Sequence, residues 1–156
     1  MVKIHTLLNV ESALARAKAI CKQQNIRFTH KRQQVLKILL TCHNAVGAYE
    51  IAERYAQQYT ESIPTMSVYR ILDFLTELGF VHKLNSINKF IACQHLSCEH
   101  KHDLPQFLIC NSCQHTQEFS ISKQTQQDLL QSSASMNFEL STKQIELFGL
   151  CKNCHP

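Results

Sequence analysis

The chain has 156 residues, of which 44% are hydrophobic, so it can bury a core and form either one domain or two small ones. It contains no run of 18 apolar residues and no export signal at its N-terminus, which argues against a membrane span and against secretion. Its eight cysteines are therefore expected in a reducing cytoplasm, where paired Cys-x-x-Cys indicates metal or redox chemistry rather than disulfides.

The positive charge is unevenly distributed. The net charge is +4, and residues 1–80 carry 10 Lys and Arg against 6 Asp and Glu, whereas residues 81–156 carry 6 of each. All the excess charge thus lies in the first half. This distribution is typical of a nucleic-acid-binding half joined to a neutral second half, although a charge of this size is also common on ordinary domain surfaces.

Helical periodicity dominates the first 60 residues. Apolar residues from Val10 to Gln24 follow the spacing of one helix face, with Asn9 as a candidate N-cap. Thr29 is positioned to cap a second helix that runs to about Cys42. A third helix is expected at roughly 48–58, after the turn that contains Gly47.

The start of the second predicted helix is rich in basic residues. His30, Lys31 and Arg32 occupy its first turns, where backbone N–H groups also point outward. Such a helix start suits a phosphate-contacting surface, and a solvated helix end explains the same residues equally well.

The segment TMSVYRILDFLTELGF predicts a fourth helix, capped by Thr65 and ended by Gly79. One face carries an apolar stripe, and the opposite face carries Met66, Arg70, Asp73 and Glu77. Ser67 and Arg70 lie in the first two turns, and the acidic residues come later. A helix that enters a major groove by its N-terminus needs this order, because acidic side chains must stay clear of the phosphates.

Two short strands are expected at 80–84 and 89–93, joined by a turn at 85–88. A β-hairpin directly behind the fourth helix completes the pattern of a winged helix-turn-helix. The second half predicts strands at 107–110 and 114–119, a helix at about 123–133, and strand-like segments at 138–140 and 144–150. An α/β unit of about sixty residues is only marginally stable alone, so we expect it to need metal, a partner chain, or both.

Two Cys-x-x-Cys pairs provide the strongest chemical signal. Cys110 with Cys113, and Cys151 with Cys154, supply four thiolates, which is the closed ligand shell of a structural zinc site. The wide gap between the pairs predicts that the metal clamps the C-terminal tail against the strand at 107–110. A thioredoxin-like redox role is disfavoured because there are two pairs and neither lies in a βαβ context.

A second group of candidate ligands lies around the junction of the two halves. It comprises His82, Cys93, His95, Cys98, His100, His102, His115 and Glu118. A metal bound by residues from this group would link the hairpin to the second half. A set that mixes cysteine, histidine and carboxylate favours zinc, whereas purely oxygen and nitrogen ligands would leave iron or manganese open.

Five segments together resemble the ferric uptake regulator family, and most closely its zinc uptake regulator branch. They are RFTHKRQQVL (27–36), AYEIAERY (48–55), PTMSVYRILDFLTELGFVHK (64–83), FLICNSC (107–113) and GLCKNC (149–154). The resemblance implies an α+β chain with an N-terminal winged helix-turn-helix, a small C-terminal α/β dimerisation domain, and metal-dependent repression. We therefore expect a DNA-binding domain at 1–93, a ligand loop at 94–106 and a dimerisation domain with structural zinc at 107–156.

The resemblance also implies individual residue roles. The sensor site of the zinc branch would match His82, Cys93, a histidine of the following loop, and Glu118. Tyr49 and Arg70 would contact bases or DNA, and Tyr69 would contact the backbone. The loop reads His-Lys-His-Asp-Leu-Pro instead of the HHxH run of iron-sensing members, which favours zinc. His102 is preferred over His100 because it is nearer to the strand that leads to Cys110, and Cys98 has no assigned role.

The sequence thus predicts a homodimeric, zinc-responsive repressor that binds about two zinc ions per chain and a double-stranded operator with two-fold symmetry. An iron-, peroxide- or thiol-sensing relative and a zinc-stabilised interaction module are the alternatives. A zinc hydrolase or deaminase is disfavoured because neither H-x-E nor P-C-x-x-C occurs in the chain.

Overall fold

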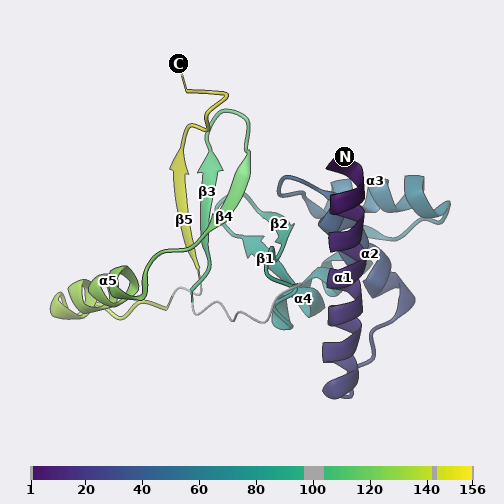
Figure 1. Cartoon of the computed structure of the whole chain (residues 1–156), viewed down its shortest axis with the longest axis horizontal. Coiled ribbons are helices and arrows are strands. Elements are labelled where there is room, and N and C mark those ends of the chain that lie inside the picture. Colours follow the sequence, from purple (N-terminus) through teal and green to yellow (C-terminus); the bar gives the residue numbers. More distant parts are fainter. Residues whose placement is uncertain (1, 97–103, 142–143, 156) are drawn as a thin grey trace. The chain divides into compact units, whose positions relative to one another are not determined.

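The computed structural model describes residues 2–96, 104–141 and 144–155, and divides the chain into two compact units, Met1–His100 and Lys101–Pro156 (Figure 1). Within the described ranges no helix is both long and apolar enough to cross a lipid bilayer. Each unit is built on its own set of helices and strands, and together they give an α+β chain.

The first unit contains four helices followed by a β-hairpin. In chain order these are α1 (Val2–Gln23), α2 (His30–Thr41), α3 (Ala48–Tyr59), α4 (Thr65–Glu77), β1 (Val81–Leu84) and β2 (Lys89–Ala92). The hairpin strands are antiparallel, with His82 opposite Ile91. A further backbone bridge pairs Val46 with Phe90, so the segment before α3 adds to the edge of the hairpin.

Helix ends in this unit follow local capping chemistry. The Thr29 hydroxyl accepts a bond from the Arg32 N–H, as the sequence predicts for an N-cap. Gly79 follows α4 with φ of +71°, a left-handed conformation that glycine adopts without steric cost. Two expected caps are wrong. Helix α1 begins at Val2, not after Asn9, and Thr65 is the first residue of α4, whose N-cap is Pro64.

A single apolar core holds the first unit together. Residues from all four helices and from the hairpin are buried in it, and the largest fully buried side chains include Tyr55, Phe80 and Phe90. The Tyr55 hydroxyl donates to Gln34 Oε1 at 2.7 Å, which satisfies the polar end of a buried ring. The core therefore fixes α4 relative to α2, α3 and the hairpin.

The second unit is a three-stranded sheet with one helix. It consists of β3 (Gln106–Cys110), β4 (Thr116–Phe119), α5 (Lys123–Ser135) and β5 (Ile145–Gly149). Figure 1 shows the strands in the order β4-β3-β5, with β3 antiparallel to β4 and parallel to β5. The strand-like pattern at 138–140 does not form a strand, so that expectation is wrong.

Candidate metal centre and outward face of helix α4

Four cysteine thiols converge in the second unit. The Sγ atoms of Cys110, Cys113, Cys151 and Cys154 all lie within 4.8 Å of one another. The parallel pairing of β3 with β5 places Cys110 opposite Gly149, so that the tail after β5 meets the turn after β3. The expected pairing of the two Cys-x-x-Cys segments is thus present in the geometry.

Backbone hydrogen bonds hold both turns in place. The Asn111 N–H donates to the Gly149 carbonyl at 2.8 Å, which joins the first turn to the end of β5. The Cys154 N–H donates to the Cys151 carbonyl at 2.9 Å and closes the second turn. The Cys151 N–H in turn points at Cys110 Sγ, 3.4 Å away.

Backbone N–H groups that point at Cys110 Sγ favour a thiolate at this position. Backbone donation from Cys113, followed by donation from Cys151, lowers the pKa of Cys110 from 9.0 to about 6. The N–H of His115 acts in the same sense on Cys113. Hydrogen bonds with the Cys151, Cys110 and Cys154 thiols outweigh it and raise the pKa of Cys113 to about 12. The backbone donors therefore favour the deprotonated form of Cys110, which is the form that binds a metal ion.

The donor set fits zinc. Tetrahedral zinc with Zn–S bonds of about 2.3 Å places its sulfur atoms roughly 3.8 Å apart. The Sγ atoms of Cys113 and Cys151 are 3.6 Å apart, close to that value. Four thiolates leave no open position for a substrate, so this site is suited to a structural and not a catalytic metal.

Two of the expected sensor ligands are neighbours in the first unit. His82 lies in β1, and Cys93 follows β2 with its N–H bonded to the Phe80 carbonyl at 3.0 Å. Successive side chains along a strand point to opposite faces, and directly paired residues share a face. Cys93 comes two residues after Ile91, the partner of His82, so His82 and Cys93 point to the same side. A ring nitrogen of His82 and Cys93 Sγ lie within 4.8 Å of each other, which is ligand-pair spacing.

No other expected sensor ligand lies among the described residues of the first unit. Glu118 lies in β4 of the second unit, opposite Phe107 of β3. His100 and His102, like Cys98, lie outside the described residues. The ligand set His82, Cys93, His102 and Glu118 therefore remains a prediction.

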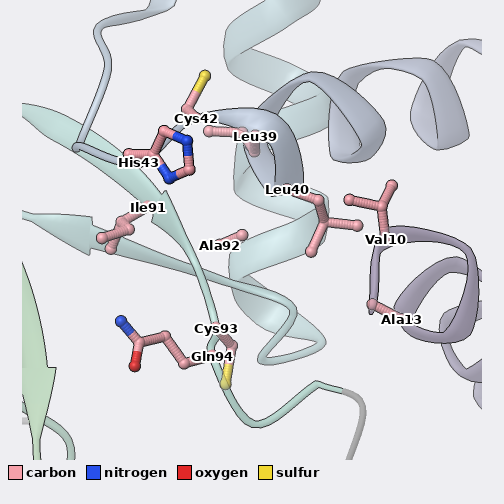
Figure 2. Close-up of a pocket in the computed structure, with 10 residues that line it drawn as sticks. All are labelled: Val10, Ala13, Leu39, Leu40, Cys42, His43, Ile91, Ala92, Cys93 and Gln94. Carbon is pink, nitrogen blue, oxygen red and sulfur yellow. The ribbon is translucent and has the colours of Figure 1, made fainter. Parts of the chain in front are cut away.

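Cys93 also borders a cavity of about 330 Å³ in the first unit. Figure 2 shows Cys93 and Gln94 at one end of this cavity, and Cys42 and His43 at the other. The remaining lining is aliphatic and comes from α1, α2 and β2. Cys42 is thus held away from Cys93, and its Sγ bonds to the Ile38 carbonyl at 3.2 Å.

Helix α4 presents the predicted face to solvent. Its stripe residues Val68, Leu72 and Leu75 are fully buried. The opposite face, Met66, Arg70, Asp73 and Glu77, is exposed. Tyr69 is partly buried, with its ring edge against Phe90 of the hairpin at a centroid distance of 6.5 Å. Tyr49 at the start of α3 is 71% exposed.

Two basic side chains at the start of α2 make contacts within the first unit. The Arg32 guanidinium lies 3.5 Å from the centre of the Phe74 ring and donates to the Arg27 carbonyl, so it ties α2 to α4. Lys31 forms an ion pair with Glu61 at 2.7 Å. The sequence pattern had not indicated either contact, because both depend on residues distant in the chain. A DNA contact by Arg32 remains a prediction.

The four helices and hairpin of the first unit form a winged helix-turn-helix, and the second unit holds the four-thiol site. This combination defines a metal-binding protein of the regulator class. Residues 23–148 match the Ferric uptake regulator family, and the chain belongs to that family. It is 35% identical over 145 residues to the zinc uptake regulation protein of Escherichia coli strain K12, which covers 92% of this chain and 82% of the relative.

Solved structures give the same grouping. The fold is similar to that of a zinc uptake regulator complexed with zinc and DNA, with a TM-score of 0.80, 31% identity, and coverage of 93% of this chain and 94% of the other. It is also similar to holo XcZur, with a TM-score of 0.73, 31% identity, and coverage of 90% and 95%. These relatives are regulators and not enzymes by name.

Proposed function

We propose that this chain is a zinc-responsive, DNA-binding transcriptional repressor that controls genes of zinc uptake and homeostasis. The observation that carries the proposal is the similarity, along nearly the whole chain and in both sequence and fold, to zinc uptake regulators, one of them complexed with zinc and DNA. A regulator of this kind would act in the cytoplasm, where the operator and the exchangeable zinc are found.

Two zinc sites per chain are proposed. Cys110, Cys113, Cys151 and Cys154 would hold a permanent structural zinc, supported by the mutual spacing of their Sγ atoms. His82, Cys93, His102 and Glu118 would hold an exchangeable regulatory zinc, with His100 as the alternative to His102. The adjacency of His82 and Cys93 on the hairpin supports this second set.

The proposed DNA surface is formed by the N-terminal ends of α3 and α4. Arg70 is exposed there and can donate two hydrogen bonds to a guanine edge. Tyr49, Ser67 and Tyr69 would complete the contacts to bases and backbone, and Arg32 would add charge near the phosphates. The exposed acidic residues Asp73 and Glu77 lie further along α4, away from the end that would enter the groove.

The second unit would form the homodimer. Leu108 and Leu147 are cross-strand neighbours in β3 and β5, and both are more than 40% exposed, at 44% and 47%. Leu130, Met136, Phe138 and Phe148 add further exposed apolar surface. Apolar patches of this kind mark interaction sites, and β5 lies at an edge of the sheet, where a second copy can pair.

In the proposed mechanism, zinc binding at the regulatory site is coupled to DNA binding. His82 and Cys93 come from the hairpin behind α4, whereas Glu118 comes from the second unit. When all four sensor residues ligate one zinc ion, they would fix each α4 at the spacing that a two-fold symmetric operator requires. Coupling of about 1–3 kcal/mol per site is typical, and DNA must tighten zinc binding by the same factor.

The test is metal counting combined with DNA binding. Zinc per chain is measured on purified wild type and Cys93→Ser, and binding to a duplex selected by the wild-type protein from a random pool is titrated against free zinc. We expect about two zinc ions per chain to fall to one, with loss of zinc-dependent binding.

The same titration distinguishes the alternatives. Activation by iron at lower free concentration than by zinc would make the chain an iron sensor. Loss of DNA binding on peroxide treatment with zinc retained would make it a redox sensor. Failure to select any duplex, with the metal sites filled, would leave only an interaction module.

A further inference from the structure

The first unit has two large apolar side chains in an unusual place. Among residues 10–96, Tyr49 and Met66 are the large hydrophobic residues that the structure exposes most, at 71% and 66%. Each is the second residue of its helix, Tyr49 of α3 and Met66 of α4. The family resemblance assigns a DNA contact to Tyr49 and assigns nothing to Met66.

Met66 lies on the outward face of α4 beside Arg70. The two residues are four positions apart, so their side chains are neighbours on the helix surface. Asp73 and Glu77 continue the same face toward the C-terminal end, and both are exposed. Because phosphates repel the acidic end, the part of this face that can approach DNA is the part formed by Met66 and Arg70.

The core does not account for Met66. The buried residues of α4 are Val68, Leu72 and Leu75, and Met66 is neither in the apolar cluster of the first unit nor packed against it. Met and Ala have similar helix propensity, so the helix itself does not require Met at this position. Its exposed surface is apolar, and that surface gains free energy when a partner covers it.

A major groove offers few partners for an apolar side chain. The edges of guanine, cytosine and adenine present hydrogen-bond donors and acceptors, whereas thymine also presents a C5-methyl group. A thioether is a weak acceptor that packs well against methyl groups and adapts to irregular surfaces.

We propose that Met66 is a specificity-determining residue that recognises thymine through its C5-methyl group, next to the base read by Arg70. The inference rests on the proposed DNA-binding function and adds a base preference that hydrogen bonding by Arg70 does not supply. Each half of a symmetric operator would then contain one thymine whose methyl group matters to this protein.

The experiment removes one methyl group at a time. The zinc-loaded wild-type protein selects duplexes from a random pool, and each thymine of a selected duplex is then replaced by deoxyuridine, which pairs identically and lacks the methyl group. For the wild type we expect a loss of affinity of about threefold to fivefold at one thymine per half-site, the effect of one buried methyl group.

Met66→Ala should bind the unmodified duplex more weakly by a similar factor and show no further loss at that thymine. Met66→Leu, which keeps an apolar side chain, should retain most of the discrimination. Gln57→Ala is the control, because Gln57 is exposed on α3 outside both the proposed DNA surface and the proposed dimer surface. It should respond to deoxyuridine as the wild type does.

Equal sensitivity of the wild type and Met66→Ala at every thymine would overturn the assignment while leaving DNA binding intact. A wild type that is insensitive to all replacements would do the same. A zinc-loaded wild type that selects no duplex would refute the proposed DNA-binding function itself, and the role of Met66 with it.

Discussion

The Sγ atoms of Cys113 and Cys151 lie 3.6 Å apart, although the two residues are 38 positions apart in the chain. The parallel pairing of β3 with β5 brings them together, because it extends to the end of both strands, at Cys110 and Gly149. The α5 helix lies between these strands in sequence. A metal held by the four thiols therefore closes the chain segment that contains β4, α5 and β5.

Replacing Cys151 with serine is expected to disrupt the second unit. The substitution removes one of the four converging thiols but keeps the backbone N–H of residue 151 that points at Cys110 Sγ. Zinc binding is therefore expected to fall and the tail after β5 to be released. Because a small unit depends on its metal for stability, we expect loss of about one zinc per chain and loss of the dimer. Metal analysis and sedimentation equilibrium measure the two effects.

Cys42→Ser provides the matched control for that prediction. Cys42 lies at the end of the cavity far from Cys93, and its Sγ donates to the Ile38 carbonyl, a bond that a serine hydroxyl can also make (Figure 2). This variant should keep its zinc and its dimer. A Cys151→Ser protein that retained full zinc and dimerisation would contradict a structural role for the four-thiol site.

Cys93→Ser is expected to separate folding from zinc response. Cys93 lies beside His82 on the hairpin and is not part of the four-thiol cluster. The variant should remain a folded dimer with the structural zinc bound, and its DNA affinity should no longer change with free zinc. Fluorescence anisotropy over a range of buffered zinc concentrations measures this. Aggregation of Cys93→Ser like that expected for Cys151→Ser would show that the division into structural and regulatory sites is wrong.

Local patterns were sufficient to predict much of the fold. Helices α2 and α3, the hairpin and the buried stripe of α4 were correctly placed, because apolar spacing and turn residues act over a few positions. The start of α1 was missed because Asn9 resembles a cap, and an asparagine within a helix gives the same local signal. The strand expected at 138–140 was wrong because a short alternating pattern forms a strand only where a neighbouring strand can pair with it.

The four thiols, and the approach of the C-terminal tail to the strand at 107–110, were predictable from spacing, whereas the parallel pairing of β5 with β3 was not. Two Cys-x-x-Cys pairs indicate a zinc site wherever they lie in a chain, but the pairing of β5 with β3 is a contact between distant segments. The same reason explains why the stacking of Arg32 on Phe74 was missed. Charge suggested a phosphate contact for Arg32, and only the packing of α2 against α4 reveals an intramolecular partner.

Arg70→Ala is expected to reduce sequence preference while leaving zinc binding and dimerisation intact. The side chain is exposed on α4, so its loss removes no packing from the core. A good bidentate contact contributes about 1–3 kcal/mol of discrimination against the wrong base. Competition between selected and scrambled duplexes measures this. Arg54→Ala is the control, since Arg54 is paired with Glu50 on the surface of α3. Unchanged preference in Arg70→Ala would exclude Arg70 from base reading.

Tyr55 is expected to make the stability of the first unit depend on alkaline pH. Burial of the ring, followed by the charge of Glu61, raises the pKa of Tyr55 above its ordinary value of 10.0. Above pH 10 the unfolded chain therefore loses the phenolic proton more readily than the folded chain. The stabilisation is fully present below that pH and is lost as the pH rises through the folded pKa.

Tyr55→Phe tests this dependence directly. At neutral pH the variant should be destabilised by about 0.5–1.5 kcal/mol, because Gln34 loses its hydrogen-bond partner inside the unit. Above pH 10 the variant should lose stability less steeply than the wild type, since it has no phenol to ionise. Urea unfolding followed by the helical circular dichroism signal at pH 7.5 and 10.5 measures both effects. Tyr49→Phe, at an exposed position, should match the wild type at both values, and an identical alkaline loss in Tyr55→Phe and wild type would assign the effect to other groups.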